Sequence, residues 1–207
     1  MKRSGFAVVV SSPSGGGKTT LVNALLAEEP LVTRVVTATT RAPRLGEKDG
    51  VDYHFWTKAR FEREIRTGGL IEHARVFDKC YGVPRKAVAD ALRRGKIPVL
   101  VIDVQGARTV ARKFKDAVLI FVLPPSWKTL EKRLRGRRDG TNNIALRLET
   151  ARAEITQAEH YGYIVVNNDI DKAVGEISAI ITAEKMKTSR RLAGMRGGIR
   201  NYRFMED

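Results

Sequence analysis

The feature that most constrains this chain is a glycine-rich segment near its N-terminus, which separates an apolar run from a helical pattern. Residues 6–10 (FAVVV) predict a buried strand, and residues 20–26 (TLVNALL) predict the start of a helix. Between them, positions 12–19 read SPSGGGKT. A strand, a glycine-rich loop and a helix N-terminus direct backbone N–H groups toward one point, where the helix dipole favours an anion. The segment therefore predicts a phosphate-binding loop.

This segment departs from the usual pattern G-x-x-x-x-G-K-[ST] at its first position, where Ser12 replaces glycine. Pro13 follows, and a residue before proline is pushed into β or polyproline conformations that an ordinary L-residue tolerates. We therefore expect the loop to form despite the substitution. The alternative, a glycine-rich turn between an unrelated strand and helix, is disfavoured by the Lys and Thr that close the motif.

The closing residues of the motif carry the expected chemistry. Lys18 would contact the outer phosphates of a nucleoside triphosphate, and the Thr19 hydroxyl would hold Mg²⁺, which bridges phosphate oxygens. The residues expected to bind ATP from this segment are Ser12, Pro13, Ser14, Gly15, Gly16, Gly17, Lys18, Thr19 and Thr20.

The rest of the chain alternates between strand-like and helical patterns. Strand-like runs recur at residues 32–38, 99–102, 118–123 and 164–166. This alternation predicts an α/β fold with a parallel sheet, whose ligand lies at the carboxyl ends of the strands. Between residues 39 and 95 the alternation breaks down, so we expect an inserted subdomain there.

Two shorter segments after residue 120 also have distinct patterns. Ser126 is the expected N-cap of a helix through Arg135, in which Trp127, Leu130 and Leu134 share one buried face. Residues 136–143 (GRRDGTNN) contain no apolar residue and predict a mobile loop.

Composition excludes several classes of protein. The 207 residues are 43% apolar, which suffices for a sizeable core, and no apolar run is long enough to span a membrane. We read the N-terminus as carrying no cleaved signal. The single cysteine, Cys80, cannot form an internal disulfide, which agrees with a reducing cytoplasm.

The charge of +15 at pH 7 indicates attraction to anionic partners, with nucleotides and RNA as candidates. Residues 185–207 contain seven Lys or Arg against two Asp or Glu. Because this segment also holds three glycines and few core-forming residues, we expect a solvated, partly mobile tail. Nonspecific RNA contact by this tail is the alternative.

Two arginines follow the second strand-like run. Positions 39–53 read TTRAPRLGEKDGVDY, which places Arg41 and Arg44 three residues apart, and guanidinium groups match the oxygens of a phosphate monoester. LIEHA at 70–74, YG at 81–82 and IDVQGA at 102–107 complete the pattern. Together these motifs resemble guanylate kinase, the ATP:GMP phosphotransferase, over roughly residues 6–183.

The resemblance implies an acceptor site for GMP. It implies that a glutamate at Glu72 accepts hydrogen bonds from guanine N1–H and the 2-amino group, whereas adenine lacks both donors and would leave the carboxylate unpaired. A hydroxyl at Thr37 would contact the base, and an acidic group at Asp103 would lie at the floor of the site. The full set implied for GMP is Thr37, Arg41, Arg44, Tyr53, Glu72, Tyr81 and Asp103.

The resemblance also implies the donor side of the reaction. An anionic GMP oxygen would attack the γ-phosphorus of MgATP without a dedicated general base. Catalytic cations are implied at Lys18, Arg133, Arg137 and Arg147, and Asn167 is implied near the ATP adenine. These three arginines match the lid and adjoining helix of the family, which fold over the transferring phosphoryl group and exclude water, a competing acceptor.

The chain departs from the family pattern at several places. Val83 stands where a Ser or Thr usually offers a hydroxyl to the base, and Val101 replaces an acidic residue. Arg138 replaces a usual glycine in a lid that is one residue short. Loss of one neutral hydrogen bond typically costs about 0.5–1.5 kcal/mol, so we expect weaker GMP binding with retained activity.

The resulting expectation is a P-loop NTPase fold with three layers around a parallel sheet, an inserted GMP-binding subdomain and a mobile lid. The kinase-like domain would span residues 1–184, with a core at 1–38 and 96–184, the insertion at 39–95 and the lid at about 136–146. The expected activity is guanylate kinase in purine nucleotide metabolism. The alternatives are a kinase for another phosphorylated acceptor, such as ribose 1,5-bisphosphate, a noncatalytic interaction module and an RNA-binding P-loop protein.

Overall fold

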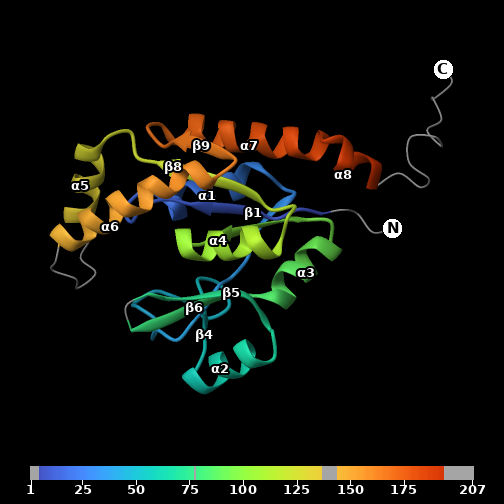
Figure 1. Ribbon diagram of the computed structural model, residues 1–207, viewed down its shortest axis with the longest axis horizontal. Helices are drawn as coiled ribbons and strands as arrows, with labels where there is room; N and C mark the ends of the chain where they lie inside the picture. The colour runs from blue at the N-terminus through green and yellow to red at the C-terminus, as the bar shows by residue number, and fades with distance from the viewer. Residues whose placement is uncertain (1–4, 77, 137–143, 194–207) are drawn as a thin grey trace.

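Five parallel strands form the central sheet of the computed structural model, which describes residues 5–76, 78–136 and 144–193 (Figure 1). The order across the sheet is β2, β7, β1, β8 and β9. In chain order the bounds are β1 (Val8–Ser11), β2 (Val32–Arg34), β7 (Ile97–Val101), β8 (Val118–Leu123) and β9 (Tyr163–Val166). The predicted α/β fold with a parallel sheet is confirmed.

Helices cover both faces of this sheet, which gives three layers (Figure 1). Helices α1 (Lys18–Glu28) and α7 (Ile170–Met186) pack on one face, over Val8 and Val10 of β1. Helices α3 (Arg85–Arg93) and α4 (Val104–Lys113) pack on the other, over Val9. Because successive β1 side chains enter different cores, Val8, Val9 and Val10 are all apolar.

A second, smaller sheet lies beyond α4 in Figure 1, with the order β4, β3, β6, β5. Its strands are β3 (Ala38–Thr39), β4 (His54–Phe55), β5 (Leu70–Val76) and β6 (Lys79–Pro84), and α2 (Lys58–Arg66) completes the unit. The strand-like run at 32–38 is therefore not one strand. Its first residues form β2 in the central sheet, and its last residue opens β3 in the second sheet.

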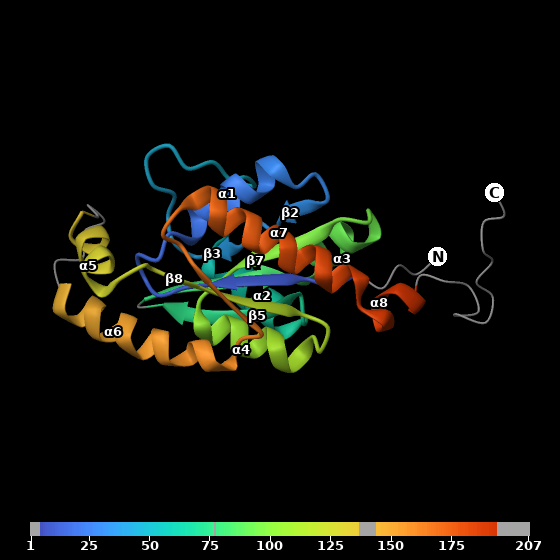
Figure 2. The same cartoon turned by 90° about the horizontal axis from the view of Figure 1, so that it is seen from above.

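Two helices follow β8 at one end of the molecule, α5 (Trp127–Arg135) and α6 (Ile144–Thr156), and the 3₁₀ turn η1 (Gln157–His160) leads from α6 into β9 (Figure 2). Ser126 caps α5 as predicted, because its hydroxyl accepts a hydrogen bond from the backbone N–H of Thr129. Leu130 and Leu134 are fully buried and pack with Ala151 of α6. The expected lid falls largely on residues 137–143, which lie outside the described residues.

The start of the basic tail differs from the solvated extension expected from composition. Helix α7 continues to Met186, and α8 (Thr188–Ala193) follows it at the opposite end of the molecule from α5 (Figure 2). The Arg190 side chain is only 10% exposed, and its guanidinium lies 4.2 Å from the ring centre of Phe6. It also donates hydrogen bonds to the Asp116 carbonyl and the Glu184 carboxylate. This part of the tail is therefore docked on the core, whereas residues 194–207 lie outside the described residues.

In the part of the chain that the structure describes, no helix combines the length and apolar character needed to cross a membrane.

Candidate functional site

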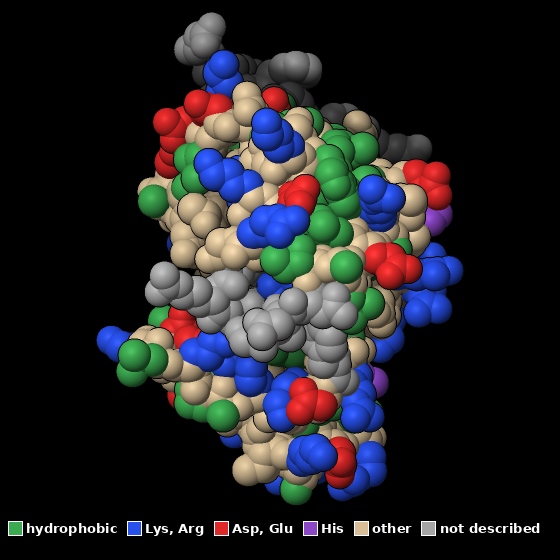
Figure 3. Space-filling view, turned by 90° about the vertical axis from the view of Figure 1, so that its left-hand side faces the viewer, with side chains coloured by type: hydrophobic (Ala, Val, Ile, Leu, Met, Phe, Trp, Pro, Cys, Tyr) green, Lys and Arg blue, Asp and Glu red, His purple; other side chains and the backbone are tan. Residues whose placement is uncertain are grey.

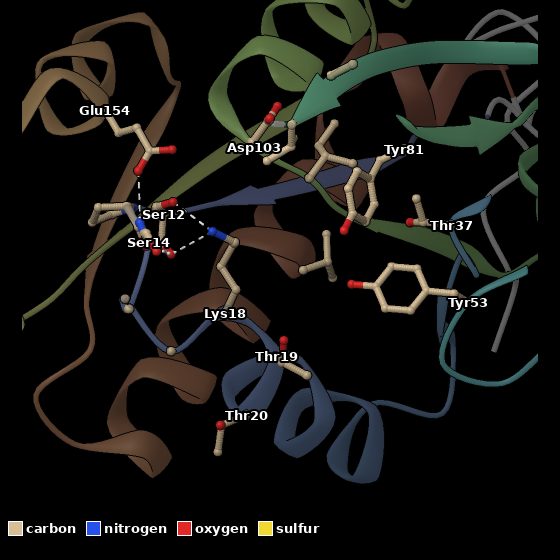
Figure 4. Close-up of a pocket in the computed structure, with 18 of the residues that line it drawn as sticks. Ser12, Ser14, Lys18, Thr19, Thr20, Thr37, Tyr53, Tyr81, Asp103 and Glu154 are labelled. Atoms are coloured by element: carbon tan, nitrogen blue, oxygen red, sulfur yellow. Dashed lines mark hydrogen bonds between the residues drawn. The ribbon is translucent and has the colours of Figure 1, made fainter. Parts of the chain in front are cut away.

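One cavity of about 370 Å³ brings the phosphate-loop motif together with residues from the second sheet (Figure 4). It lies at the carboxyl ends of β1 and β7, as expected for a parallel sheet. Its lining includes the whole loop from Ser12 to Thr20 and, opposite, Thr37, Tyr53, Glu72, Tyr81 and Asp103. The cavity therefore joins the two halves of the predicted site.

The loop adopts a conformation that requires its glycines. Gly15 and Gly17 have φ angles of 85° and 89°, which disfavour any residue with a side chain. A Cβ atom on Gly17 would also lie only 2.6 Å from Asn167 Nδ2. Gly17 is the N-cap of α1, so the first backbone N–H groups of that helix face the cavity side of the loop.

Ser12, the departure from the motif, is almost completely buried and takes part in the loop. Its hydroxyl donates a hydrogen bond to the Pro13 carbonyl at 2.9 Å. Lys18 Nζ donates to the Ser12 carbonyl at 2.7 Å and to the Ser12 hydroxyl at 3.1 Å (Figure 4). The substitution thus adds a hydroxyl ligand for the lysine and leaves the loop intact.

Two further predicted residues, Asn167 and Arg133, lie close to the loop at Gly16 and Gly17. Asn167, just after β9, donates a hydrogen bond through Nδ2 to the Gly16 carbonyl at 3.2 Å. Arg133 on α5 has a buried Nη1 atom with no hydrogen-bond partner among the described residues, 3.7 Å from where a Cβ on Gly17 would lie. A buried guanidinium nitrogen without a partner is costly, and an anion in the loop would supply one.

The opposite side of the cavity presents hydroxyl groups. The rings of Tyr53 and Tyr81 meet edge to face with centres 6.0 Å apart, and both hydroxyls point into the cavity (Figure 4). Burial raises the pKa of the Tyr53 hydroxyl. Thr37 lies beside them and is 9% exposed. These neutral donors are placed to contact an anion without adding charge.

Glu72 is the most deeply buried charged group of this side, with 2% exposure. Burial, followed by the nearby Asp103 carboxylate, raises its pKa from 4.5 to about 7, while Lys113 and the Val83 backbone act in the opposite direction. Asp103 caps α4 by accepting a hydrogen bond from the Gly106 N–H at 2.8 Å. A Cβ on Gly106 would lie 2.8 Å from Glu72 Oε2, so this glycine leaves room for the carboxylate.

The two predicted phosphate-binding arginines do not line the cavity. Arg41 forms an ion pair with Glu47 at 2.8 Å, and its guanidinium lies 5.4 Å from the ring centre of Tyr53. Arg44 is exposed, and its backbone N–H donates to the same Glu47 carboxylate. Arg41 is therefore next to the cavity but engaged elsewhere.

Of the other two arginines predicted at or next to the lid, the structure describes only Arg147, which does not line the cavity. Arg147 is half-buried on α6 and has interactions with its surroundings. Arg137 lies outside the described residues.

The two valine departures have different surroundings. Val101 lines the cavity, two residues before Asp103. Val83 lies opposite Glu72 in the β5–β6 register but is fully buried and packs in the core with Ile71.

Sequence reasoning missed two polar groups of the cavity region. Glu154 on α6 lines the cavity, and its Oε2 accepts a hydrogen bond from the Ser14 N–H at 2.9 Å (Figure 4). Burial raises its pKa, which the Ser14 N–H and Lys18 oppose. Tyr161 lies close by, and burial raises its pKa to about 12. The seven-residue spacing between Arg147 and Glu154, which puts both on one helix face, was the available signal.

The donor set suits a magnesium ion held partly by a ligand. Among residues 5–76, 78–136 and 144–193, no group of three or more His, Cys, Asp or Glu could hold a metal ion. The cavity does offer the Thr19 hydroxyl, and Mg²⁺ prefers such oxygen ligands together with waters and phosphate oxygens. Figure 3 shows Lys and Arg side chains on both halves of the face at the α5 and α6 end, which favours anionic ligands.

The chain is similar to known proteins over most of its length. A family model described as guanylate kinase matches residues 4–184. A relative named guanylate kinase from Rhodospirillum rubrum is 48% identical over 92% of this chain and 88% of its own length. One from Paramagnetospirillum magneticum is 45% identical over 93% of this chain and 91% of its own. A crystal structure of guanylate kinase from Anaplasma phagocytophilum, 40% identical, has a TM-score of 0.76 and covers 92% of this chain and 91% of that chain.

Proposed function

Because the chain belongs to the guanylate kinase family, we propose that it transfers the γ-phosphate of MgATP to GMP, giving ADP and GDP. This proposal rests on one observation, a cavity that is lined both by the glycine-rich loop and by a buried carboxylate and two tyrosine side chains. A triphosphate on one side and a nucleoside monophosphate on the other would meet within it.

On the donor side, the loop and α1 hold the ATP phosphates. The backbone N–H groups from Gly15 to Thr20 supply neutral donors, and Lys18 moves from the Ser12 carbonyl to the outer phosphates. Arg133 supplies its buried Nη1 as a further donor. Asn167, held against Gly16, lies near the adenine.

On the acceptor side, guanine and its phosphate are recognised separately. Glu72 in its ionised form accepts hydrogen bonds from guanine N1–H and the 2-amino group, with Thr37 and Asp103 beside it. Tyr53 and Tyr81 donate to the GMP phosphate. Arg41 and Arg44 join them once the phosphate replaces Glu47 as the partner of Arg41.

Catalysis rests on positioning and charge neutralisation. A GMP phosphate oxygen attacks the γ-phosphorus in line while the bond to the β–γ bridging oxygen breaks, so ADP leaves with that oxygen. No general base is needed, because the attacking oxygen is already anionic near neutral pH. Arg133, Arg137 and Arg147 stabilise the transferring group and help exclude water.

Magnesium is the metal that this site suits. Thr19 would hold it together with ATP oxygens, and the ion would supply charge neutralisation at the outer phosphates.

The domain division follows the same proposal. The core at 1–38 and 96–184 binds ATP, the insertion at 39–95 binds GMP, and a lid at about 136–146 covers the transferring group. The basic tail at 185–207, whose start is docked on the core, is assigned to neither substrate. We place the enzyme in the cytoplasm, in purine nucleotide metabolism and GMP recycling.

A coupled assay with MgATP and either GMP, AMP, UMP or ribose 1,5-bisphosphate tests the proposal. We expect GMP to be clearly preferred, and Lys18→Ala to abolish turnover as the matched negative control. A preference for ribose 1,5-bisphosphate would identify the alternative kinase, and no turnover with any acceptor would favour a noncatalytic module. Deleting residues 194–207, which leaves α7 and the docked α8 in place, and measuring salt-dependent RNA binding beside GMP turnover separates a catalytic role of this part of the tail from an electrostatic one.

A further inference from the structure

The phosphate loop is attached to the helix pair α5 and α6 by two adjacent contacts. At Ser14, the backbone N–H donates to Glu154 Oε2 at 2.9 Å across 140 residues of sequence. At Gly15, a Cβ would meet side-chain carbons of Leu130 and Leu134 at 3.1 Å, so the loop backbone already packs closely on α5. One contact is polar and the other apolar, and they join neighbouring loop residues to different helices.

These two contacts are linked to each other by the apolar core between α5 and α6. Leu130 and Leu134 pack on Ala151, which is fully buried on α6. Glu154 follows Ala151 by three residues, about one helical turn, so the packing that fixes Ala151 also aims the carboxylate. The loop therefore contacts α5 at Gly15, α5 packs on α6, and α6 contacts the loop at Ser14. Together these contacts fix the distances between the loop and the two helices.

The same two helices carry cations of the proposed reaction. Arg133 lies on α5 between the two leucines that pack on Gly15, and Arg147 lies on α6 seven residues before Glu154. Any change in the distance between the loop and the helix pair would therefore move both guanidinium groups relative to the bound phosphates. A shift of about 1 Å can reduce a rate by about 100-fold when it alters the geometry of reacting groups.

We propose that Glu154 is a positioning residue. By accepting a hydrogen bond from the Ser14 N–H, its carboxylate fixes the position of helices α5 and α6 relative to the phosphate loop. The proposal rests on the proposed kinase function, because its consequence is the alignment of Arg133 and Arg147 on the transferring phosphoryl group. The required property is a hydrogen-bond acceptor at this point and not a negative charge. A negative charge at this point would only repel the triphosphate bound beside it.

Three variants separate these properties. Glu154→Ala removes the acceptor, Glu154→Gln keeps a carbonyl acceptor without the charge, and Glu149→Ala removes an exposed glutamate from the same helix as a matched control. We expect Glu154→Ala to lower kcat up to about tenfold with an unchanged KM for GMP, since the loss of one intramolecular hydrogen bond corresponds to a factor of up to about ten. Glu154→Gln should remain within about threefold of wild type, and Glu149→Ala should equal it.

Amide hydrogen exchange at Ser14 in the ligand-free protein provides a readout that needs no kinase activity. We expect exchange to be about tenfold faster in Glu154→Ala and within about threefold of wild type in Glu154→Gln. Thermal unfolding of each variant shows whether it is folded, and the Gln variant retains the test if the Ala variant unfolds.

The outcomes are distinct. Wild-type kcat and exchange in Glu154→Ala overturn the proposal, and so does a lower KM for ATP in both variants, which would mean that the carboxylate competes with phosphate. Equal kcat losses in the Gln and Ala variants would show that charge matters and would also overturn it. If the wild-type protein fails to phosphorylate GMP, the kinase proposal fails, while Ser14 exchange still decides the role of Glu154 in holding the loop.

Discussion

Glu72 and Glu184 are both 2% exposed, yet their surroundings shift the pKa values of the two carboxyl groups in opposite directions. Glu184, at the end of α7, accepts hydrogen bonds from the Tyr163 hydroxyl at 2.6 Å, Lys187 at 2.6 Å and Arg190 at 2.8 Å. Burial alone would raise its pKa, but these three donors lower it. Glu72 instead lies near Asp103, and its pKa is raised to about 7.

The difference separates a structural carboxylate from one that awaits a ligand. The charge of Glu184 is compensated within the chain, and it ties β9, α7 and α8 together at the end remote from the cavity. The charge of Glu72 is poorly compensated until donors arrive from outside. Under the proposed function, a guanine base would supply two such donors, so that stability given up at Glu72 would be recovered on binding.

The largest expected effect comes from neutralising Glu72. In Glu72→Gln the amide retains one acceptor but presents N–H donors to the guanine amino group, so one hydrogen bond is lost and one repulsive contact is formed. We expect kcat/KM for GMP to fall about 100- to 1000-fold, with the KM for ATP unchanged. Steady-state kinetics with each substrate varied measure this. A loss below fivefold would remove the contrast between the two glutamates.

Removing Glu184 should affect stability and not catalysis. Glu184→Ala leaves Arg190 and Lys187 without their carboxylate partner, and breaking a buried ion pair in this way costs about 4 kcal/mol. Urea unfolding measures the loss, with Glu176→Ala on the exposed face of α7 as the control, expected within about 0.5 kcal/mol of wild type. A stable variant with impaired GMP turnover would contradict the structural assignment.

The pH dependence of stability should have opposite signs at the two residues. At Glu72 the folded-state pKa is raised from 4.5 to about 7, so its contribution is present below pH 4.5 and is lost as the pH rises toward 7. The free energy of unfolding of Glu72→Gln relative to wild type should thus increase over this interval, by up to about 3 kcal/mol. At Glu184 the pKa is lowered, so its contribution is present at neutral pH and is lost on acidification.

Urea titrations at half-unit steps from about pH 3 to 8 test both signs, because the loss at Glu184 occurs below its ordinary pKa of 4.5. Glu72→Gln should remove the loss of stability between pH 5 and 7, whereas Glu184→Gln should remove the loss on the acid side. A difference between wild type and Glu72→Gln that does not vary with pH would show that the buried carboxylate is compensated within the chain after all.

The smallest expected effect is at Val83, which lies opposite Glu72 in the strand register. Val83→Thr adds a hydroxyl near the guanine site, and one hydrogen bond of about 1 kcal/mol corresponds to a several-fold lower KM for GMP. Val88→Thr, a buried valine of the same core on α3, is the control for a hydroxyl placed in apolar surroundings. An unchanged KM in Val83→Thr would show that another group compensates for the missing hydroxyl.

Local patterns predicted much of the fold because they act through short-range interactions. The strand, loop and helix around Gly17 follow from apolar runs, glycine conformation and the helix N-terminus. Ser126 was identified as a cap because its partner, the Thr129 N–H, is three residues away. The run at 32–38 was misread as one strand, because strand propensity does not reveal which of two sheets a residue joins.

The motifs predicted which residues belong to the candidate site, but they did not predict the contacts that these residues make. Thr37, Tyr53, Glu72, Tyr81 and Asp103 do converge on one cavity with the phosphate loop. The pairing of Arg41 with Glu47 and the attachment of Ser14 to Glu154 had no motif of their own. The docked start of the tail was missed because basic composition resembles a solvated segment until its carboxylate partner is located.

The sequence by itself determined the family, the glycine-rich loop and the residues proposed for the acceptor side, because each of these is encoded by residue type and short spacing. The tertiary structure alone decided the state of two buried carboxylates, Glu72 and Glu184, and of the half-buried Glu154. Burial and then Asp103 raise the pKa of Glu72, the Ser14 N–H donates a hydrogen bond to Glu154, and Tyr163 and Arg190 donate to Glu184. Desolvation and charge interactions depend on neighbours in space, and most of these neighbours are tens of residues away along the chain.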